Sequence, residues 1–123
     1  MRIYPRQFNI KSLHKTISEL SLNIIDDSLN FNFTDGSRLK LHDNSLTCCE
    51  KRYMVTDDNL NDFIGAILLR IEIRDAPDVI NEILEVHEVQ FLAVTTSKGI
   101  FTISNHNEHN GYYGGFSIEA IEG

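Results

Sequence analysis

The sequence predicts an α+β domain that is mainly β: an antiparallel sheet of about six or seven strands with one or two short helices packed on it. Three observations support this fold class. Apolar and polar residues alternate along several short segments, which is the period of a strand with one buried face. Turn signals such as Asp35-Gly36 and Ser97-Lys98-Gly99 separate such segments, as in hairpins. No βαβ spacing appears, which disfavours a parallel doubly wound sheet.

The chain begins with a segment whose boundary stays open. Residues 11–19 fit a short helix or a turn, because Ser12 could cap it and Leu13 and Ile17 are four residues apart. From Ile17 to Ile25 the β-branched residues favour a strand instead. A hairpin follows over 29–41, where apolar residues alternate with polar ones on both sides of the Asp35-Gly36 turn.

The middle of the chain predicts a loop, a helix and a strand. Residues 42–58 form the loop, with a short extended piece around Tyr53-Met54-Val55. Thr56 or Asp57 can cap a helix over 59–64, which Gly65 ends and which is too short to stand without packing on the sheet. The next strand places Ile67, Leu69, Ile71 and Ile73 on one face and ends at Asp75-Ala76-Pro77-Asp78. Residues 79–84 fit a helical turn or an irregular segment.

The last third predicts a long strand, a hairpin and a final strand. Residues 86–96 are apolar on both faces, with Phe91 on one side and Leu92 on the other. That pattern is typical of a central strand or of a strand in a subunit interface, and a homo-oligomer would cover the exposed face. After the Ser97-Lys98-Gly99 turn, residues 100–104 return, and Phe116, Ile118 and Ala120 alternate in a last strand.

Length and composition limit the class of protein. The 123 residues fit a single domain, 1–123, and 41% hydrophobic residues suffice for an ordinary core. The N-terminus lacks the apolar region of a signal peptide, and no run reaches the roughly 18 apolar residues of a membrane span. We therefore expect a soluble, cytoplasmic protein. The adjacent Cys48-Cys49 pair makes no metal or redox motif and fits small buried side chains.

The charge balance disfavours nucleic acid as a partner. The formal net charge is −7, from 18 acidic and 11 basic residues. An acidic surface repels phosphate backbones, whereas it suits a basic protein partner or simply confers solubility, which is the commoner reason.

The strongest candidate for a site is the glycine-rich stretch from Asn105 to Phe116, which we expect to be a loop between two strands. Its amides, imidazoles and phenols can bond and stack on a polar, ring-bearing ligand, and its glycines allow close approach of the backbone. A nucleotide-type ligand would fit, with phosphates neutralised by arginines or by Lys51 or Arg52. A structural turn is the plain alternative. The expected ligand-binding residues are Asn105, His106, His109, Asn110, Tyr112, Tyr113, Arg70 and Arg74.

The histidines also suggest two other chemistries, metal binding and acid–base catalysis. Zinc needs three or four ligands, and His106, His109 and Glu108 with the preceding Glu85-Val86-His87-Glu88 offer enough candidates, but a glycine-rich loop differs from the known helical His motifs. Acid–base catalysis by the same imidazoles and glutamates lacks a nucleophile elbow or phosphate loop beside it. We therefore expect no metal, no cofactor and no catalytic residue.

The order of several short motifs resembles a family of small phage and bacterial proteins of unassigned function. These motifs are Cys48-Cys49-Glu50, the Ile64-Gly65 helix end and Asn110-Gly111-Tyr112-Tyr113. Two departures mark a divergent member, namely the absence of tryptophan and the Gly114-Gly115 pair after the tyrosines. The resemblance implies a phage or mobile-element setting, in which small acidic proteins often act against host defence, but it supplies no catalytic residues.

Together these features predict a non-enzymatic binding protein of the phage counter-defence type. It would either inhibit a host defence protein or sequester a nucleotide-type signal in the host cell cytoplasm. The alternative is a small metal-dependent or His/Glu acid–base hydrolase that uses the His106/His109 loop.

Overall fold

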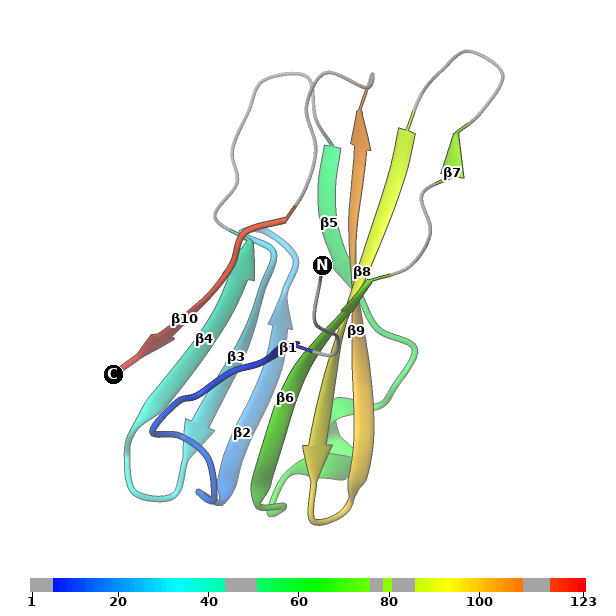
Figure 1. Cartoon of the computed structure of the whole chain (residues 1–123). Coiled ribbons are helices and arrows are strands. Elements are labelled where there is room, and N and C mark those ends of the chain that lie inside the picture. Colours follow the sequence, from blue (N-terminus) through cyan, green and yellow to red (C-terminus); the bar gives the residue numbers. More distant parts are fainter. Residues whose placement is uncertain (1–5, 44–50, 76–78, 81–85, 110–115) are drawn as a thin grey trace.

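The computed structural model describes residues 6–43, 51–75, 79–80, 86–109 and 116–123. Within these residues, eight longer strands form two four-stranded antiparallel sheets (Figure 1), and two strands of two residues each add to the first sheet. The first sheet, here the β8–β9 sheet, has the order β6(Leu68–Asp75), β8(Val86–Thr96), β9(Gly99–His109), β5(Lys51–Val55). The short β1(Arg6–Gln7) pairs with β6 and β7(Val79–Ile80) with β8.

The second sheet, here the β3–β4 sheet, has the order β10(Ile118–Glu122), β4(Arg38–Asp43), β3(Ser28–Phe33), β2(Ile17–Asn23). Its β3–β4 hairpin confirms the one predicted over 29–41, with Asp35-Gly36 in the turn. Gly36 has a φ of 85°, which glycine adopts without strain. From Leu29 to Phe33 the burial of β3 alternates, as the sequence pattern that predicted the strand requires.

The two sheets pack face to face around one apolar core. Phe31 of the β3–β4 sheet lies 6.5 Å from Phe101 of the β8–β9 sheet, measured between ring centroids, and both are fully buried. Large buried side chains of both sheets belong to the same cluster. The prediction of a mainly β, antiparallel fold is therefore confirmed. The prediction of a single sheet of six or seven strands covered by helices is wrong, because a second sheet covers the first and buries its apolar face.

Helices contribute little to the described part of the chain, which has no α-helix. The predicted helix over 59–64 is the single 3-10 turn η1(Leu60–Phe63), capped by the side chain of Asn59. The segment predicted as a helix or turn at 11–19 is a turn followed by β2. Its backbone joins the two sheets: the Ile17 N–H donates to the Ala66 carbonyl and the Gly65 N–H to the Ile17 carbonyl, at 2.8 and 2.7 Å. No helix of the described residues is long and apolar enough to cross a membrane.

The start of β6 departs from the predicted alternation. The register with β8 shifts between Leu68 and Arg70, as in a β-bulge. Leu68 is therefore fully buried with Ile71, whereas Leu69 and Ile67, which were predicted on the core face, are each 39% exposed. One extra residue reverses the facing of every side chain before it.

The β8–β9 hairpin is the longest element and corrects the predicted loop. Eleven cross-strand pairs join the two strands, from Thr96↔Gly99 at the turn to Val86↔His109 at the far end. Residues 105–109, expected to begin a loop, therefore continue strand β9. In Figure 1 this far end of the hairpin extends beyond the end of β4, on the side where Asp43 lies. The burial pattern of β9 alternates strictly along this stretch, so consecutive side chains lie on opposite faces.

Candidate functional site

The far end of the β8–β9 sheet carries two polar clusters on opposite faces. Side chains of directly opposite residues lie on the same face of a sheet, so the strand register shows on which face each side chain lies. The inner cluster faces the space between the sheets and consists of Arg52, Glu88, Gln90, Asn105, Asn107 and His109. The outer cluster lies on the other face and consists of Tyr53, His87, His106 and Glu108.

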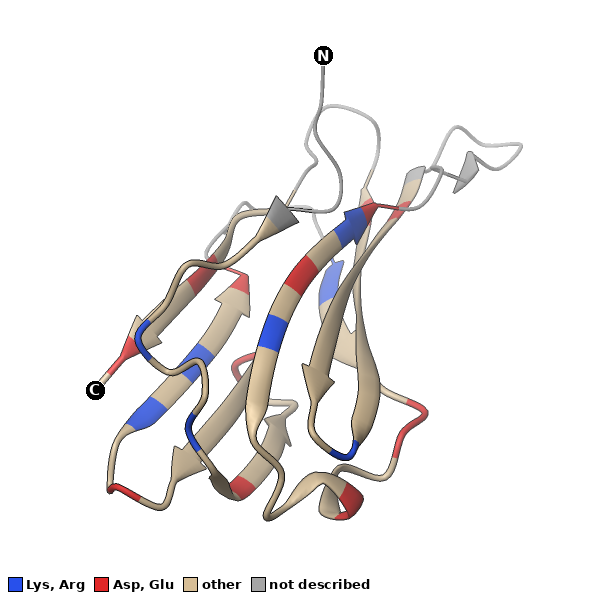
Figure 2. Ribbon diagram, turned by 60° about the horizontal axis from the view of Figure 1, so that its bottom comes forward, with Lys and Arg blue, Asp and Glu red and all other residues tan. Residues whose placement is uncertain are grey.

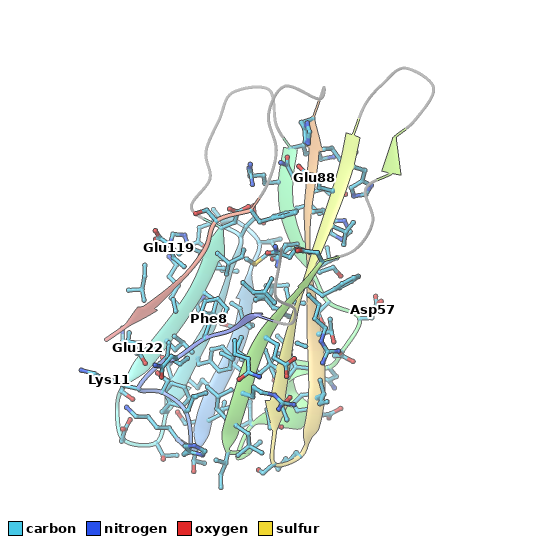
Figure 3. The ribbon with its side chains drawn as sticks, viewed as in Figure 1. Phe8, Lys11, Asp57, Glu88, Glu119 and Glu122 are labelled. Carbon is cyan, nitrogen blue, oxygen red and sulfur yellow. The ribbon has the colours of Figure 1, made fainter. Side chains whose placement is uncertain are left out.

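Charged and polar contacts hold the inner cluster. A guanidinium nitrogen of Arg52 lies 2.6 Å from the carboxylate of Asp43 on β4, and both side chains are at least nine-tenths buried. The Gln90 side-chain amide donates to Asp75 at 2.7 Å. At the far end, Nε2 of His109 lies 2.7 Å from the carboxylate of Glu88. Figure 3 labels Glu88 at the end of β8, beyond the end of the β3–β4 sheet. The Arg52–Asp43 contact thus ties the two sheets together where the polar residues begin.

One member of the inner cluster stands out because its amide is buried without a partner. Asn105 is 2% exposed, and neither its Nδ2 nor its Oδ1 finds a hydrogen bond among the described residues. Its cross-strand partner Gln90 is 4% exposed, and its Oε1 is likewise unmatched there. Each buried polar atom without a partner costs about 1–3 kcal/mol. Such groups are rare in folded proteins and mark places where water, an ion or a ligand supplies the missing bond.

Aromatic stacking and hydrogen bonds organise the outer cluster. The rings of Tyr53 and His106 stack with centroids 4.7 Å apart and planes only 5° from parallel. The Tyr53 hydroxyl donates to Glu108 at 2.8 Å, and Nε2 of His87 lies 2.9 Å from Nδ1 of His106. Burial, followed by Glu108, raises the pKa of Tyr53 above its usual value. Burial and the neighbouring His87 lower the pKa of His106, which favours its neutral ring.

The predicted ligand-binding residues do not form one group. Asn105 and His109 face inward and His106 faces outward, because they alternate along a strand. The imidazoles of His106 and His109, which the metal and acid–base hypotheses placed at one site, therefore lie on opposite faces of β9. Among the described residues, no group of three or more histidine, cysteine or acidic side chains is placed to hold a metal ion. Asn110, Tyr112, Tyr113 and the Cys48-Cys49-Glu50 motif lie outside the described residues.

Arg70 and Arg74 lie away from the inner cluster. Both are on the outer face of β6 and contact the carboxylate of Glu72 between them, Arg74 at 3.3 Å. Charges of alternating sign along this strand are visible in Figure 2. The cation that does face the inner cluster is Arg52, which the sequence offered as one of four candidates. A buried arginine, Asn107 and Gln90 could have been grouped from the sequence only with the correct register of three strands.

A separate hollow of about 390 Å³ lies at the other end of the β3–β4 sheet, where β4 begins and β10 ends. Its lining includes the side chains of Lys11, Lys15 and Arg38 and the carboxylate of Glu122. Figure 3 labels Lys11 and Glu122 close together near the end of β10. Lys15 is engaged by Asp35 at 3.1 Å and by Ser37 at 2.8 Å, so the local charges are partly balanced. Of the predicted site residues that the structure describes, none lines this hollow.

Comparison with known proteins identifies the family. Residues 11–118 match the model of a domain of unknown function (DUF7448), and the chain belongs to this family. The matched range spans β2 to β9, including the three strands β5, β8 and β9 that carry the inner and outer clusters, and β4, which carries Asp43. No curated protein and no solved structure matches the chain.

Proposed function

We propose that the protein is a non-enzymatic binding protein that holds a small, polar, ring-bearing ligand against the inner cluster. The observation that carries this proposal is Asn105, whose buried amide has neither its donor nor its acceptor matched among the described residues. A ligand that bonds both atoms would offset the desolvation of this side chain.

The row of side chains across the sheet defines what such a ligand must offer. Asn105 lies between Met54 of β5 and Gln90 of β8 in the register, and Gln90 lies beside Asp75 of β6. The asparagine presents a donor and an acceptor, and Gln90 presents a further acceptor. Met54, 3% exposed, adds an apolar, adaptable surface next to them. A planar ring with an amide-like edge, as in a nucleobase, complements this row.

The charges of the inner cluster narrow the ligand class further. Among the described residues, Arg52 is paired with Asp43, and the carboxylates of Asp75 and Glu88 bind Gln90 and His109. The acidic groups thus outnumber the guanidinium, which disfavours a phosphate at this position. A nucleobase or nucleoside therefore fits better than the phosphorylated ligand considered from the sequence. Arg70 and Arg74 do not change this balance, because Glu72 engages both.

Binding is favoured over catalysis by the separation of the histidines. A hydrolase built on His106 and His109 would need both imidazoles at one substrate, but they lie on opposite faces of β9. The pair that remains on the inner face is His109 with Glu88, and no serine or cysteine nucleophile accompanies it among the members of the inner cluster.

The resemblance to small phage and bacterial proteins and the acidic charge support a phage counter-defence setting for this proposal. In a phage counter-defence role, a protein that holds a nucleoside-type signal would lower its free concentration in the host cytoplasm. The net charge of −7 supports the variant of this proposal in which a basic host defence protein is the partner. The ligand proposal and the partner proposal are separable, because only the first requires the inner cluster.

Native mass spectrometry of protein purified from cells tests the ligand proposal. We expect a mass above that of the bare chain, and a released species that is chemically unchanged after heating. Asn105→Leu, which keeps the side-chain size but removes the amide, should abolish the added mass. The matched control is Asn32→Leu on β3, whose amide donates instead to the exposed Glu19. Equal ligand content in both variants would contradict the assignment of Asn105.

If the purified protein carries nothing, a panel of nucleobases and nucleosides should restore the mass increase and raise the melting temperature in a concentration-dependent way. Failure of the whole panel would overturn the nucleobase proposal. Capture of a host protein by both the wild type and Asn105→Leu would then support the partner proposal instead.

A further inference from the structure

The outer cluster contains a pair of imidazoles that the proposed binding function does not use. Nε2 of His87 on β8 and Nδ1 of His106 on β9 lie 2.9 Å apart, and the two ring planes are inclined by 42°. The strands that carry them are joined by the long β8–β9 ladder, so their backbones are fixed relative to each other. Two convergent nitrogens on rigid strands are the minimum of a chelating site.

The separation of the two nitrogens selects the coordination geometry. Metal–imidazole bonds are about 2.0–2.1 Å long. Two nitrogens 2.9 Å apart then subtend an angle of about 90° at a shared ion, since the separation is about 1.4 times the bond length. A tetrahedral ion would require about 3.3–3.4 Å between them. The spacing therefore suits neighbouring positions of a square-planar or tetragonal ion, which is the preference of Cu²⁺ and Ni²⁺.

The surroundings of the pair hold the ring of His106 in place. Tyr53 stacks on one side of its ring, and Val89 is its cross-strand partner on the other side. Glu108, which accepts the Tyr53 hydroxyl bond, adds a negative charge on the same face.

We propose that His87 and His106 form a two-imidazole site for a divalent ion of square-planar or tetragonal preference, with Cu²⁺ bound most tightly. The hydrogen bond between the rings requires one of the two nitrogens to carry a proton. On binding, that ring moves its proton to its other nitrogen, so both ligating nitrogens are free and no net proton is lost. Water completes the coordination, and the affinity order follows the general rise towards Cu²⁺ and fall to Zn²⁺.

Titration with Cu²⁺ in a non-coordinating buffer, after treatment with a chelator, tests this site. Calorimetry should give one strong site per chain, and electron paramagnetic resonance should show two equatorial nitrogen ligands. His87→Gln and His106→Gln should each weaken binding by about tenfold or more, since even an outer-shell partner is worth that much. His42→Gln, which changes a half-buried histidine of the other sheet, is the matched control and should bind as the wild type does.

A measurement on the wild-type protein tests the proposal even if the variants fold poorly. Sub-stoichiometric Cu²⁺ should broaden the ring resonances of His87 and His106 first, before those of His42 and His109. Wild-type affinity in the double variant His87→Gln/His106→Gln, or first broadening at another histidine, would overturn the proposal. Tighter binding of Zn²⁺ than of Cu²⁺ would overturn the square-planar assignment. Because the pair lies on the outer face, these outcomes are independent of ligand binding at Asn105.

Discussion

Asn105 of β9 and Gln90 of β8 are direct cross-strand partners, and their side-chain amides lie side by side on the face of the sheet that points into the molecule. Both are at least 96% buried at a position where the neighbouring pair towards the turn, Leu92 and Ile103, is wholly apolar. On this inner face the β8–β9 ladder thus changes from an apolar core to a polar interior between one cross-strand pair and the next. This change marks the boundary between the apolar core and the inner cluster.

The packing of the two sheets predicts a large loss of stability on truncating Phe101. This fully buried ring contacts Phe31 across the core and Phe63 of η1. Phe101→Ala should lower the free energy of unfolding by about 3–5 kcal/mol, because it removes buried apolar area and leaves a cavity. Urea unfolding of the variant and the wild type measures this difference in the free energy of unfolding. The adjacent Ile100 is 56% exposed, so Ile100→Ala should change stability by only about 0.5 kcal/mol. Equal losses of unfolding free energy in the two variants would contradict the packing of the two sheets around Phe101.

The Arg52–Asp43 pair predicts a strong penalty for removing one partner. Arg52→Met removes the cation beside Oδ2 of the buried Asp43 carboxylate, whose other oxygen, Oδ1, accepts the Ser117 N–H at 3.0 Å. Breaking a buried ion pair in this way should cost about 3–5 kcal/mol. The control Lys51→Met changes the neighbouring exposed cation. Denaturant unfolding of both variants checks the prediction, and a loss at Arg52 no larger than at Lys51 would show that the contact between the sheets is not formed in solution.

The contacts of the Glu122 carboxylate should stabilise the folded state at neutral pH, and acidification should remove this contribution. Burial raises its pKa, but the hydrogen bonds from the Ser12 hydroxyl and from the Lys11 and Ser12 backbone outweigh burial, so the pKa lies below its usual 4.5. A carboxyl whose pKa is lower in the folded state stabilises the fold above its unfolded pKa and loses that contribution as the pH falls through the folded value. The melting temperature of Glu122→Gln should therefore fall less than that of the wild type on acidification below pH 4.5.

The control for this pH effect is Glu19→Gln, which removes an exposed carboxylate from β2. It should leave the acid-induced fall in melting temperature close to that of the wild type. An unchanged pH dependence in Glu122→Gln would contradict the contribution of the Ser12 contacts, which measure 2.7 Å from both the backbone nitrogen and the hydroxyl.

The engagement of Arg70 and Arg74 by Glu72 predicts that neither arginine contributes to binding at the inner cluster. Arg70→Gln and Arg74→Gln should leave the ligand content of the purified protein unchanged, as measured by native mass spectrometry. Loss of ligand in either variant would instead support the phosphate-neutralising role expected from the sequence.

Much of the fold could be predicted because alternation is a local signal. The β3–β4 hairpin followed from strict alternation on both sides of Asp35-Gly36, and β8 from apolar residues on both faces. What covers a buried face is not a local property, so all strands were expected in one sheet covered by short helices, whereas four of them form a second sheet that covers the first. A β-bulge is equally difficult to predict from local alternation. The bulge near Leu68 places Ile67 and Leu69 on the face opposite to the one expected.

The candidate site was misread for a related reason. Asparagine and histidine are common in turns, so their density at 105–109 favoured a loop, whereas pairing with β8 makes this stretch a strand. The alternation Asn105, Asn107, His109 was present in the sequence, but polar residues on a buried face contradict the usual pattern of a strand. Sequence alone also could not bring Tyr53, 53 residues before His106, against its ring.

The most direct test of the central claim is a two-dimensional ¹H–¹⁵N spectrum of the side-chain amides, recorded during titration with nucleobases and nucleosides. If the inner cluster binds such a ligand, the Nδ2 protons of Asn105 and the Nε2 protons of Gln90 should shift and become protected from exchange, while those of Asn32 stay in place. If no member of the panel moves Asn105, or if the first amide to respond lies elsewhere, the inner cluster is not the binding site.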